Sequence, residues 1–415
     1  MAPLTPASKS LRFQGEQMLA YAEETAMTII DADQHLFERP DFWRAYCEPK
    51  QRDLALSIEP DDLGYWHLTN NWLGKRIWQA WVPTPEDGMA AMRETFQRRR
   101  RGEPSVVDYA RDLPRAYSDP DARLTQLDVM KVDKALMLPH WGLIWANAVT
   151  GATHLDVVRA NLEAENRRAV EVQGGSSGRL LGVGHLSLRG GDLGWFRQQV
   201  ESLAQGGVRF AFMCSGLIDG RRWSHPDHEA AWAMLADHGI AILFHVQDNE
   251  MRPSGLPEGW FENDPDWFIS AVEQPFVYLG VQVTLTDLTL NGVFERHPKL
   301  KVCCVELHAD WFPPLCRQLD AAYENHRRVA GRDLYALQAS PSVYLKRAVR
   351  LAPHWTDRVP ELIAGFGSDH FMFGSDYPHC EGLASLDSYR DLVGELPGAE
   401  AERRLLGGVV AEFLA

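Results

Sequence analysis

Three polar residues alternate along the first apolar segment of the chain. Asp31, Asp33 and His35 in AMTIIDADQH (26–35) are separated by single residues. Side chains two apart on a strand point to the same face. A carboxylate and an imidazole on one face can bind a single cation, because both are ordinary ligands of divalent metals. The spacing therefore favours a metal-binding pair at Asp33 and His35.

Two further metal-competent residues follow apolar segments far along the chain. His245 ends a run of five apolar residues in IAILFHV (240–246), and Asp376 ends FMFGSD (371–376). Burying the imidazole of His245 in an apolar core without a hydrogen-bond partner or a metal would cost free energy. The carboxyl ends of parallel barrel strands gather around one axis and carry the active sites of barrel enzymes. If these segments are strands of one barrel, both residues meet Asp33 and His35 at one cation.

Short apolar runs recur along the chain and alternate with amphipathic stretches. The alternation implies parallel strands joined by helices, and eight strands over 415 residues favour a closed barrel over an open sheet. We predict an α/β fold, a distorted (β/α)8 TIM barrel over residues 26–415, with residues 1–25 as an N-terminal extension. The expected strands are 26–35, 134–140, 179–187, 208–214, 240–246, 301–308, a weaker PSVYL at 341–345, and 371–376.

The alternation is interrupted between about residues 47 and 115. The segment SIEPDDLGYWHLTNNWLGKRIWQAWVP indicates a meander of short strands, and a helix follows it. We interpret this part as an insertion after the first strand that covers the barrel mouth. Most of its tryptophans are expected to pack the insertion against the barrel. Trp78 and Trp81 are also expected to line a substrate pocket, because aromatic rings offer large, rigid contact areas.

Composition narrows the classes of partner. The formal net charge of −15 repels phosphate backbones and anionic lipids, so we expect neither nucleic acid nor membrane partners. No apolar run approaches the roughly 20 residues of a membrane helix, and the N-terminus lacks the apolar core of a secretory signal. None of the six cysteines forms a C-x-x-C pair, which argues against a zinc finger. A cytoplasmic protein is expected.

Five segments together carry a family resemblance. They are IIDADQHLFE (29–38), DPDARLTQLDVMKVDKALMLP (119–139), GIAILFHV (239–246), GVFERHPKLKVCCVELHADWFPPLCRQLD (292–320) and FMFGSDYPHCEG (371–382). In order and spacing they resemble the amidohydrolase-related superfamily, in the branch that includes aminocarboxymuconate-semialdehyde decarboxylase and its hydrolase relatives. The resemblance covers nearly the whole barrel.

The resemblance implies roles for the four residues above. Asp33 and His35 correspond to the first-strand metal pair, and His245 to the fifth-strand ligand. Asp376 corresponds to the eighth-strand aspartate, which binds the metal and exchanges protons with a metal-activated water. The implied cofactor is a divalent metal, zinc in the first place, with iron or manganese as alternatives and one or two ions.

The sixth expected strand departs from the family pattern. Many relatives, decarboxylases among them, carry a catalytic histidine six residues before a proline, but counting back from Pro313 gives Leu307. By the resemblance, the flanking Glu306 is a candidate catalytic residue and metal ligand that could bridge a second ion. His308 is a candidate acid/base or oxyanion stabiliser. One of the two could instead be only a hydrogen-bonded neighbour of the ligands.

Other polar residues near strand ends are expected to support the site. His140 and His185 end further apolar runs, and we expect structural or substrate-contacting roles for them. Arg347, after PSVYLK, is predicted to pair with a substrate carboxylate. His379 and Glu381, in the loop after Asp376, are expected to fix that loop and orient the aspartate.

Several functions remain open at this stage. The first is a hydrolase of amides, esters or thioesters, possibly in a specialised pathway, in which Asp376 carries the proton to the leaving group. The alternative is a non-oxidative decarboxylase of an aromatic or unsaturated carboxylic acid; the missing histidine and the insertion favour hydrolysis. A hydratase is a weaker third possibility.

A different class is a catalytically silent barrel that binds a ligand. The altered sixth strand and the chain end LLGGVVAEFLA motivate it, and the four ligand positions speak against it. We expect a small-molecule or peptide-derived substrate and a homodimer.

Overall fold

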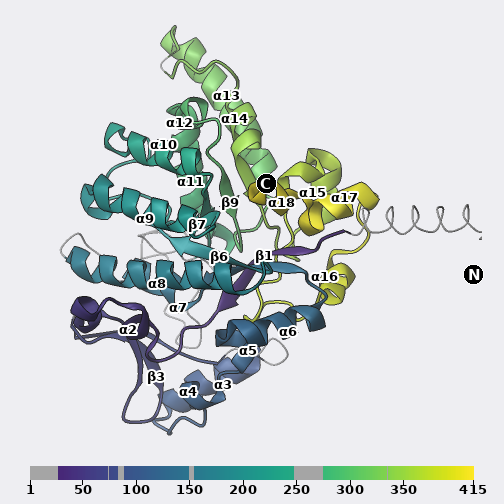
Figure 1. The fold of residues 1–415 in the computed structure, drawn as a ribbon. Helices are drawn as coiled ribbons and strands as arrows, with labels where there is room; N and C mark the ends of the chain where they lie inside the picture. Colours follow the sequence, from purple (N-terminus) through teal and green to yellow (C-terminus); the bar gives the residue numbers. More distant parts are fainter. Residues whose placement is uncertain (1–26, 73, 83–87, 149–153, 247–273, 334) are drawn as a thin grey trace, which may run out of the picture.

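Seven parallel strands form a curled sheet at the centre of the computed structural model (Figure 1). The structure describes residues 27–72, 74–82, 88–148, 154–246, 274–333 and 335–415, so the expected extension 1–25 lies outside the described residues. The strands occur in the order β1 (Ile30–Leu36), β5 (Lys134–Pro139), β6 (Leu180–His185), β7 (Phe210–Phe212), β8 (Ala241–Phe244), β9 (Val302–Cys304) and β10 (Val349–Leu351).

The segment 371–377 occupies the eighth position between β10 and β1. Parallel bridges join Phe371 to Leu351 and Tyr377 to Gln34. The amide of Ala32 also donates to the carbonyl of Phe373 at 2.8 Å. No regular ladder forms, because Asp376 has a φ of 56° that breaks the pleat and a proline follows Tyr377. The predicted distorted barrel is confirmed, and its last strand is reduced to bridges.

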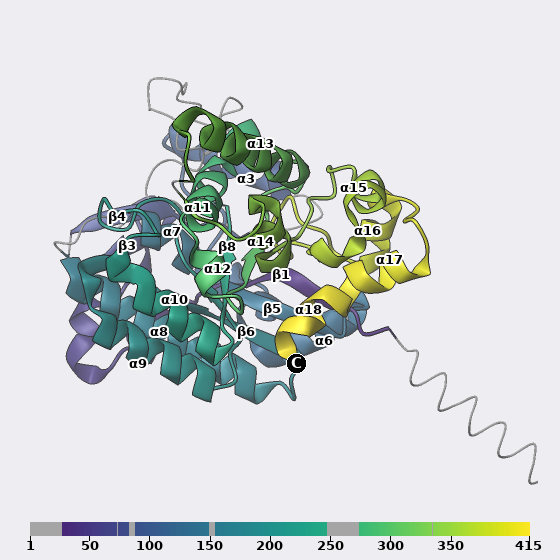
Figure 2. The same cartoon turned by 90° about the horizontal axis from the view of Figure 1, so that it is seen from above.

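Helices surround the strands in both views of the ribbon (Figures 1 and 2). The longer helices are α6 (Pro120–Met130), α7 (Trp141–Ala148), α8 (Leu155–Gly175), α9 (Leu193–Gln205), α10 (Glu229–His238), α11 (Leu279–Leu290), α13 (Phe312–Ala330), α14 (Pro341–Ala348), α15 (Val359–Phe366) and α16 (Leu386–Val393). The shorter helices are α2 (Phe42–Tyr46), α4 (Tyr109–Asp112), α5 (Arg115–Ser118), α12 (Val293–Arg296), α17 (Ala399–Arg403) and α18 (Val409–Leu414).

The prediction of a strand at PSVYL is wrong, because these residues begin helix α14. The buried residues of this helix are Pro341, Tyr344, Leu345 and Ala348, a spacing of three, four and seven that belongs to one helical face. Pro341 suits the first turn of a helix, where no N–H is needed. The seventh strand, β10, starts directly after the helix, at Val349.

Between β1 and β5 the chain forms a small antiparallel sheet and a helix. Strand β3 (Trp66–Asn70) pairs with β2 (Ser57–Pro60) on one side and with β4 (Lys75–Gln79) on the other. Helix α3 (Gly88–Arg100) follows. These elements lie at the lower end of the view in Figure 1.

Apolar side chains fill the barrel, and the end of the chain seals one opening. Alternate strand residues such as Leu136 and Val183 form the interior cluster, which also contains Val409 and Val410 of α18. The ring of Phe413 lies 5.4 Å from that of Phe210, at the start of β7. Helix α18 therefore plugs the barrel at the amino ends of the strands.

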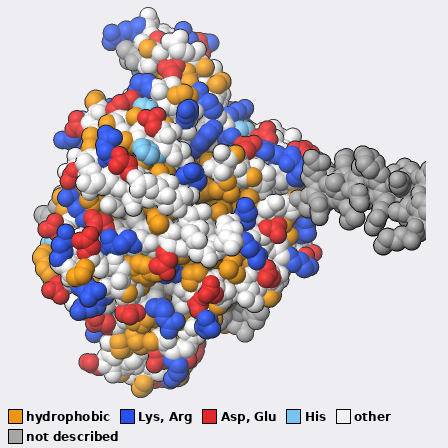
Figure 3. Space-filling view, viewed as in Figure 1, with side chains coloured by type: hydrophobic (Ala, Val, Ile, Leu, Met, Phe, Trp, Pro, Cys, Tyr) orange, Lys and Arg blue, Asp and Glu red, His pale blue; other side chains and the backbone are white. Residues whose placement is uncertain are grey.

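The described helices and the face shown in Figure 3 bear on the predicted classes of partner. Among the described residues, no helix is both long and apolar enough to cross a membrane. Acidic and basic side chains are intermingled on the face shown in Figure 3. The net charge of −15 is therefore not gathered into one acidic area on that face.

Replacing Gly182 with alanine is expected to destabilise the fold by about 3 kcal/mol. A Cβ at this position of β6 would lie 2.1 Å from the carbonyl oxygen of Ala169 on α8, and neither backbone can move freely. The matched control is Gly174→Ala within α8, where an added Cβ meets open space. It should be neutral or stabilising by up to about 1 kcal/mol. Equal unfolding free energies for the two variants in urea would contradict the close packing of α8 on β6.

Candidate metal centre

Four ligand atoms converge where the strands end. His35 Nε2 lies 3.3 Å from Asp376 Oδ1 and 3.5 Å from Asp33 Oδ1. It also lies 3.3 Å from His245 Nε2, which is 3.9 Å from Asp33 Oδ1. A tetrahedral ion with ligand bonds of about 2.0–2.1 Å separates its ligands by about 3.3–3.4 Å. The four atoms therefore have nearly the spacing that one cation requires.

Hydrogen bonds fix how the two imidazoles face each other. His35 Nδ1 is 2.9 Å from the carbonyl of Pro139, and His245 Nδ1 is 2.9 Å from the carbonyl of Val246. A carbonyl only accepts, so each Nδ1 donates and each neutral ring presents a lone pair at Nε2. Two lone pairs 3.3 Å apart repel each other unless a proton or a cation lies between them. Both rings are thus oriented as ligands.

Buried carboxylate oxygens at the same place lack hydrogen bonds. Within the described part of the chain, no hydrogen bond reaches Asp33 Oδ1, either oxygen of Asp376, or Glu306 Oε2. Glu306 Oε2 lies 2.9 Å from His245 Nε2, and Asp376 Oδ1 lies 2.6 Å from His379 Nδ1, without hydrogen-bond geometry. Orphaned buried oxygens are costly, and a divalent cation would satisfy them. The residues at this site therefore have the ligand types and the unsatisfied oxygens that a divalent metal ion requires.

The electrostatics of the cluster favour positive charge at its centre. Burial disfavours a charged His245, but Glu306 and Asp33 together outweigh burial and raise the pKa of His245 to about 9. The pKa of His35 is likewise raised, because Asp33 and Asp376 outweigh the burial of its ring. Burial raises the pKa of the Asp376 carboxyl to about 6. Without a cation, protons would take its place.

Glu306, Asp376 and the neighbouring His308 have an unusual backbone conformation. The φ angles are 52° at Glu306, 57° at His308 and 56° at Asp376. The left-handed region costs an L-residue about 1–2 kcal/mol. Such conformations persist where the surroundings enforce them, as they do at binding and catalytic sites.

A buried arginine holds the end of β1 in place. The guanidinium of Arg123, which is fully buried, donates to the carbonyl of His35 at 2.8 Å and to Gln34 Oε1 at 3.1 Å. It also lies 5.0 Å from the centre of the Tyr377 ring in the closing segment. Arg123 therefore links the strand that carries His35 to the segment that carries Asp376.

Comparison with known families now identifies the chain. The family model described as amidohydrolase matches residues 30–408. The chain belongs to the amidohydrolase family. A search of curated proteins finds no match.

Solved structures of amidohydrolases and decarboxylases share this fold. An amidohydrolase from Mycobacterium avium subsp. paratuberculosis K-10 is 23% identical, with a TM-score of 0.73 over 94% of this chain and 100% of its own. The 5-carboxyvanillate decarboxylase of Sphingomonas paucimobilis is 15% identical, with a TM-score of 0.61 over 94% and 99%. That of Novosphingobium aromaticivorans, with bound manganese, is 15% identical, with a TM-score of 0.62 over 94% and 97%. At these identities the likeness shows the fold alone.

Two histidines extend the candidate metal centre. His379 Nε2 lies 2.7 Å from His140 Nδ1, so Asp376, His379 and His140 follow one another in contact. The ring nitrogens of His35, His140 and His379 could hold a cation, as could ligand atoms of His35, Glu306, Asp376 and His379. Sequence reasoning gave His379 only a supporting role. The sequence feature that could have indicated a larger role is the position of His379, three residues after Asp376.

Two other predicted contact residues lie away from the centre. His185 Nδ1 lies 2.6 Å from Glu165 Oε2, which engages the ring in the packing of β6 on α8. Arg347 was expected to reach the site from the seventh strand. The residue lies instead in the last turn of α14, before β10 begins. Its guanidinium donates to the carbonyl of Phe294. Arg347 is therefore at the opposite end of the strand from the centre.

The two predicted pocket tryptophans have different outcomes. The ring of Trp81 lies 5.9 Å from that of His140 and 5.0 Å from that of Trp141, both in edge-on contacts. Trp81 thus brings the insertion to the centre. Trp78 lies in β4, but its side chain is outside the described residues.

Glu38 positions His140, and sequence reasoning missed it. Its carboxylate accepts hydrogen bonds from the amides of His140, Trp141 and Gly142 at 3.2, 2.9 and 3.2 Å, at the start of α7. The acid is 1% exposed. Burial, and then the charge of Glu165, raises the pKa of Glu38 to about 7.

This pKa predicts a pH-dependent stability. Between about pH 4.5 and 7 the unfolded chain has lost the Glu38 proton and the folded chain keeps it, so the contribution of Glu38 to stability falls as pH rises. Relative to a Glu38→Gln variant, which cannot ionise, the wild type should lose about 3 kcal/mol between about pH 5 and 8. Urea unfolding at both pH values measures this change. A constant difference between the two proteins would show that Glu38 ionises normally when folded.

Proposed function

We propose that the protein is a metal-dependent hydrolase that acts on the carbonyl group of an amide, ester or thioester. The observation that carries the proposal is the charge balance of the centre. Asp33 and Asp376 place two buried carboxylates around the position for one divalent cation, and Glu306 adds a third, partly exposed carboxylate whose Oε2 is buried. A neutral carbonyl adds no charge there. The carboxylate of a decarboxylase substrate would be a fourth negative group in a buried site, which is unfavourable.

Each ligand has a defined task in this proposal. Asp33, His35 and His245 hold the cation, and two imidazoles with carboxylates suit zinc first, with iron or manganese as alternatives. A bound divalent cation lowers the pKa of a water toward ~7 and polarises the carbonyl. Asp376 takes the proton from the water and delivers it to the leaving group. His379, 2.6 Å from Asp376 Oδ1, keeps that carboxylate oriented.

Decarboxylation of an aromatic or unsaturated acid is the second candidate. Similar solved structures include decarboxylases, one of which holds manganese and a hydroxy-methoxy-nitrobenzoic acid. In this chain Glu306 would be the proton donor to carbon, because burial and the nearby Asp376 raise its pKa. The same Glu306 adds the negative charge that disfavours an anionic substrate.

Isotope labelling separates the two reactions. The purified protein, loaded with Zn²⁺ or Mn²⁺, is given p-nitrophenyl acetate, acetanilide and hydroxybenzoates in ¹⁸O-water. Hydrolysis places label in the acetate product, whereas decarboxylation releases CO₂ from the hydroxybenzoates without labelling a carboxylate. Release of CO₂ with no hydrolysis of either carbonyl probe would overturn the proposal. Less than about half an equivalent of metal after reconstitution would favour the silent barrel.

A further inference from the structure

Asp357 lies in the loop between β10 and α15, away from every ligand in sequence. Its side chain is buried, and its carboxylate accepts three hydrogen bonds. Oδ1 accepts from His308 Nδ1 at 2.8 Å, and Oδ2 accepts from the amides of Ala309 and His354 at 2.9 Å each. One carboxylate therefore fastens the loop that follows β9 to the loop that follows β10.

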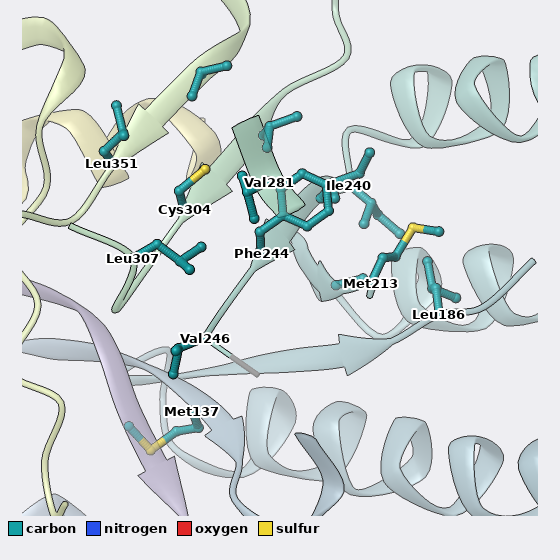
Figure 4. Close-up of a cluster of buried hydrophobic side chains, with 14 of the residues drawn as sticks. Met137, Leu186, Met213, Ile240, Phe244, Val246, Val281, Cys304, Leu307 and Leu351 are labelled. Atoms are coloured by element: carbon teal, nitrogen blue, oxygen red, sulfur yellow. The ribbon is translucent and has the colours of Figure 1, made fainter. Parts of the chain in front are cut away.

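The loop after β9 needs such a fastening. Glu306 and His308 both have left-handed backbone conformations, which L-residues adopt only when other contacts hold them there. Leu307, between them, is fully buried in the apolar cluster that contains Phe244 and Cys304 (Figure 4). The core thus holds the loop at Leu307 from one side, and Asp357 holds it at His308 and Ala309 from the other.

This conformation decides where Glu306 points. With the loop held in this way, Glu306 Oε2 lies 2.9 Å from His245 Nε2, at the edge of the cation position. A loop that relaxed to ordinary φ angles at Glu306 would turn that side chain to another direction. The link from Asp357 to the centre therefore runs through the backbone of three residues.

We propose that Asp357 is a positioning residue of the metal centre: by holding the loop 306–309 in its strained conformation it keeps Glu306 at the cation, so that cation affinity depends on Asp357. This proposal extends the proposed function. It rests on that function in one respect, which is that the centre binds a divalent cation. Partners that orient metal ligands typically change affinity by about 10–100-fold when removed.

The first test compares Asp357→Asn with Asp310→Asn by calorimetric titration of the metal-free proteins with Mn²⁺. The amide nitrogen of asparagine cannot accept, so the variant cannot receive hydrogen bonds at both oxygen positions, and it loses the carboxylate charge that strengthens them. We expect about 10–100-fold weaker Mn²⁺ binding by Asp357→Asn. Asp310 is an exposed acid in the loop after β9, without a hydrogen bond or ion pair to the described residues. Asp310→Asn removes the same charge and should bind within about twofold of the wild type, since an exposed charge contributes little.

The second test uses backbone strain and does not depend on the folding of Asp357→Asn. His308→Ala and His308→Gly both remove the imidazole that donates to Asp357, but glycine adopts a φ of 57° without steric cost. We expect His308→Ala to bind Mn²⁺ several-fold more weakly than His308→Gly, a rescue that loss of the imidazole alone would not produce. Equal affinities of these two variants, or Asp357→Asn binding as tightly as Asp310→Asn, would overturn the inference. A wild type that binds no Mn²⁺ would overturn the proposed function together with it.

Discussion

Replacing Asp376 with asparagine is expected to lower the hydrolysis of p-nitrophenyl acetate by at least about 10³-fold. Asparagine keeps the size of the side chain and one oxygen at the position 3.3 Å from His35 Nε2, but its amide cannot carry a proton between water and leaving group. The fold should persist. Burial raises the pKa of Asp376 to about 6, so a neutral side chain suits this place in the metal-free protein.

Turnover, metal content and the thermal midpoint of the metal-free protein measure these expectations. Asp369→Asn is the matched control, because Asp369 is an exposed acid whose ion pair with Arg404 lies at the surface. That pair contributes little to stability, so the control should keep its turnover. If Asp376→Asn turned over the ester as fast as the wild type, Asp376 would have no part in the mechanism.

Replacing His35 with alanine is expected to weaken divalent metal binding by more than about 100-fold. Removing a residue that only orients a metal ligand typically weakens binding by about 10–100-fold, and removing a ligand itself should cost more. His35 belongs to all three groups of described residues that could hold an ion, and its Nε2 lies within 3.5 Å of three other ligand atoms. Metal analysis after dialysis against trace Zn²⁺ measures the loss.

The control for His35→Ala is His185→Gln. His185 also ends a barrel strand and is also buried, but its ring is bound to Glu165. This variant should retain metal. If His185→Gln lost as much metal as His35→Ala, retention would depend on general packing of the barrel and not on the cluster around His35.

The barrel could be predicted because most of its strands lie in apolar runs and are buried. Seven of the eight expected runs correspond to strands or to the closing segment 371–377. The exception, PSVYL, is apolar and β-branched enough to suggest a strand, yet its buried residues repeat with helical spacing. A run of five residues is too short to distinguish the two periods. The true strand, β10, has only three residues and carries the polar Arg350 in its middle.

The four expected ligands could be predicted because each lies in or directly after an apolar run. Their positions along the chain therefore fixed where the barrel would place them. His379, Glu38 and Asp357 were harder, because hydrogen bonds between distant loops define their roles. Glu38 reaches α7 from the segment after β1, and Asp357 reaches the β9 loop from the loop after β10. Loop conformations depend on such contacts, and local sequence does not encode them.

The plug formed by α18 has a consequence for biosynthesis. Val409 and Val410 close the interior of a barrel whose first strand begins at Ile30, so the two parts are separated by nearly the whole chain. Until α18 has been synthesised, the earlier strands can assemble, but their apolar lining stays open to water at one end. Nascent chains of this protein therefore offer chaperones an exposed hydrophobic opening until residues 405–414 leave the exit tunnel.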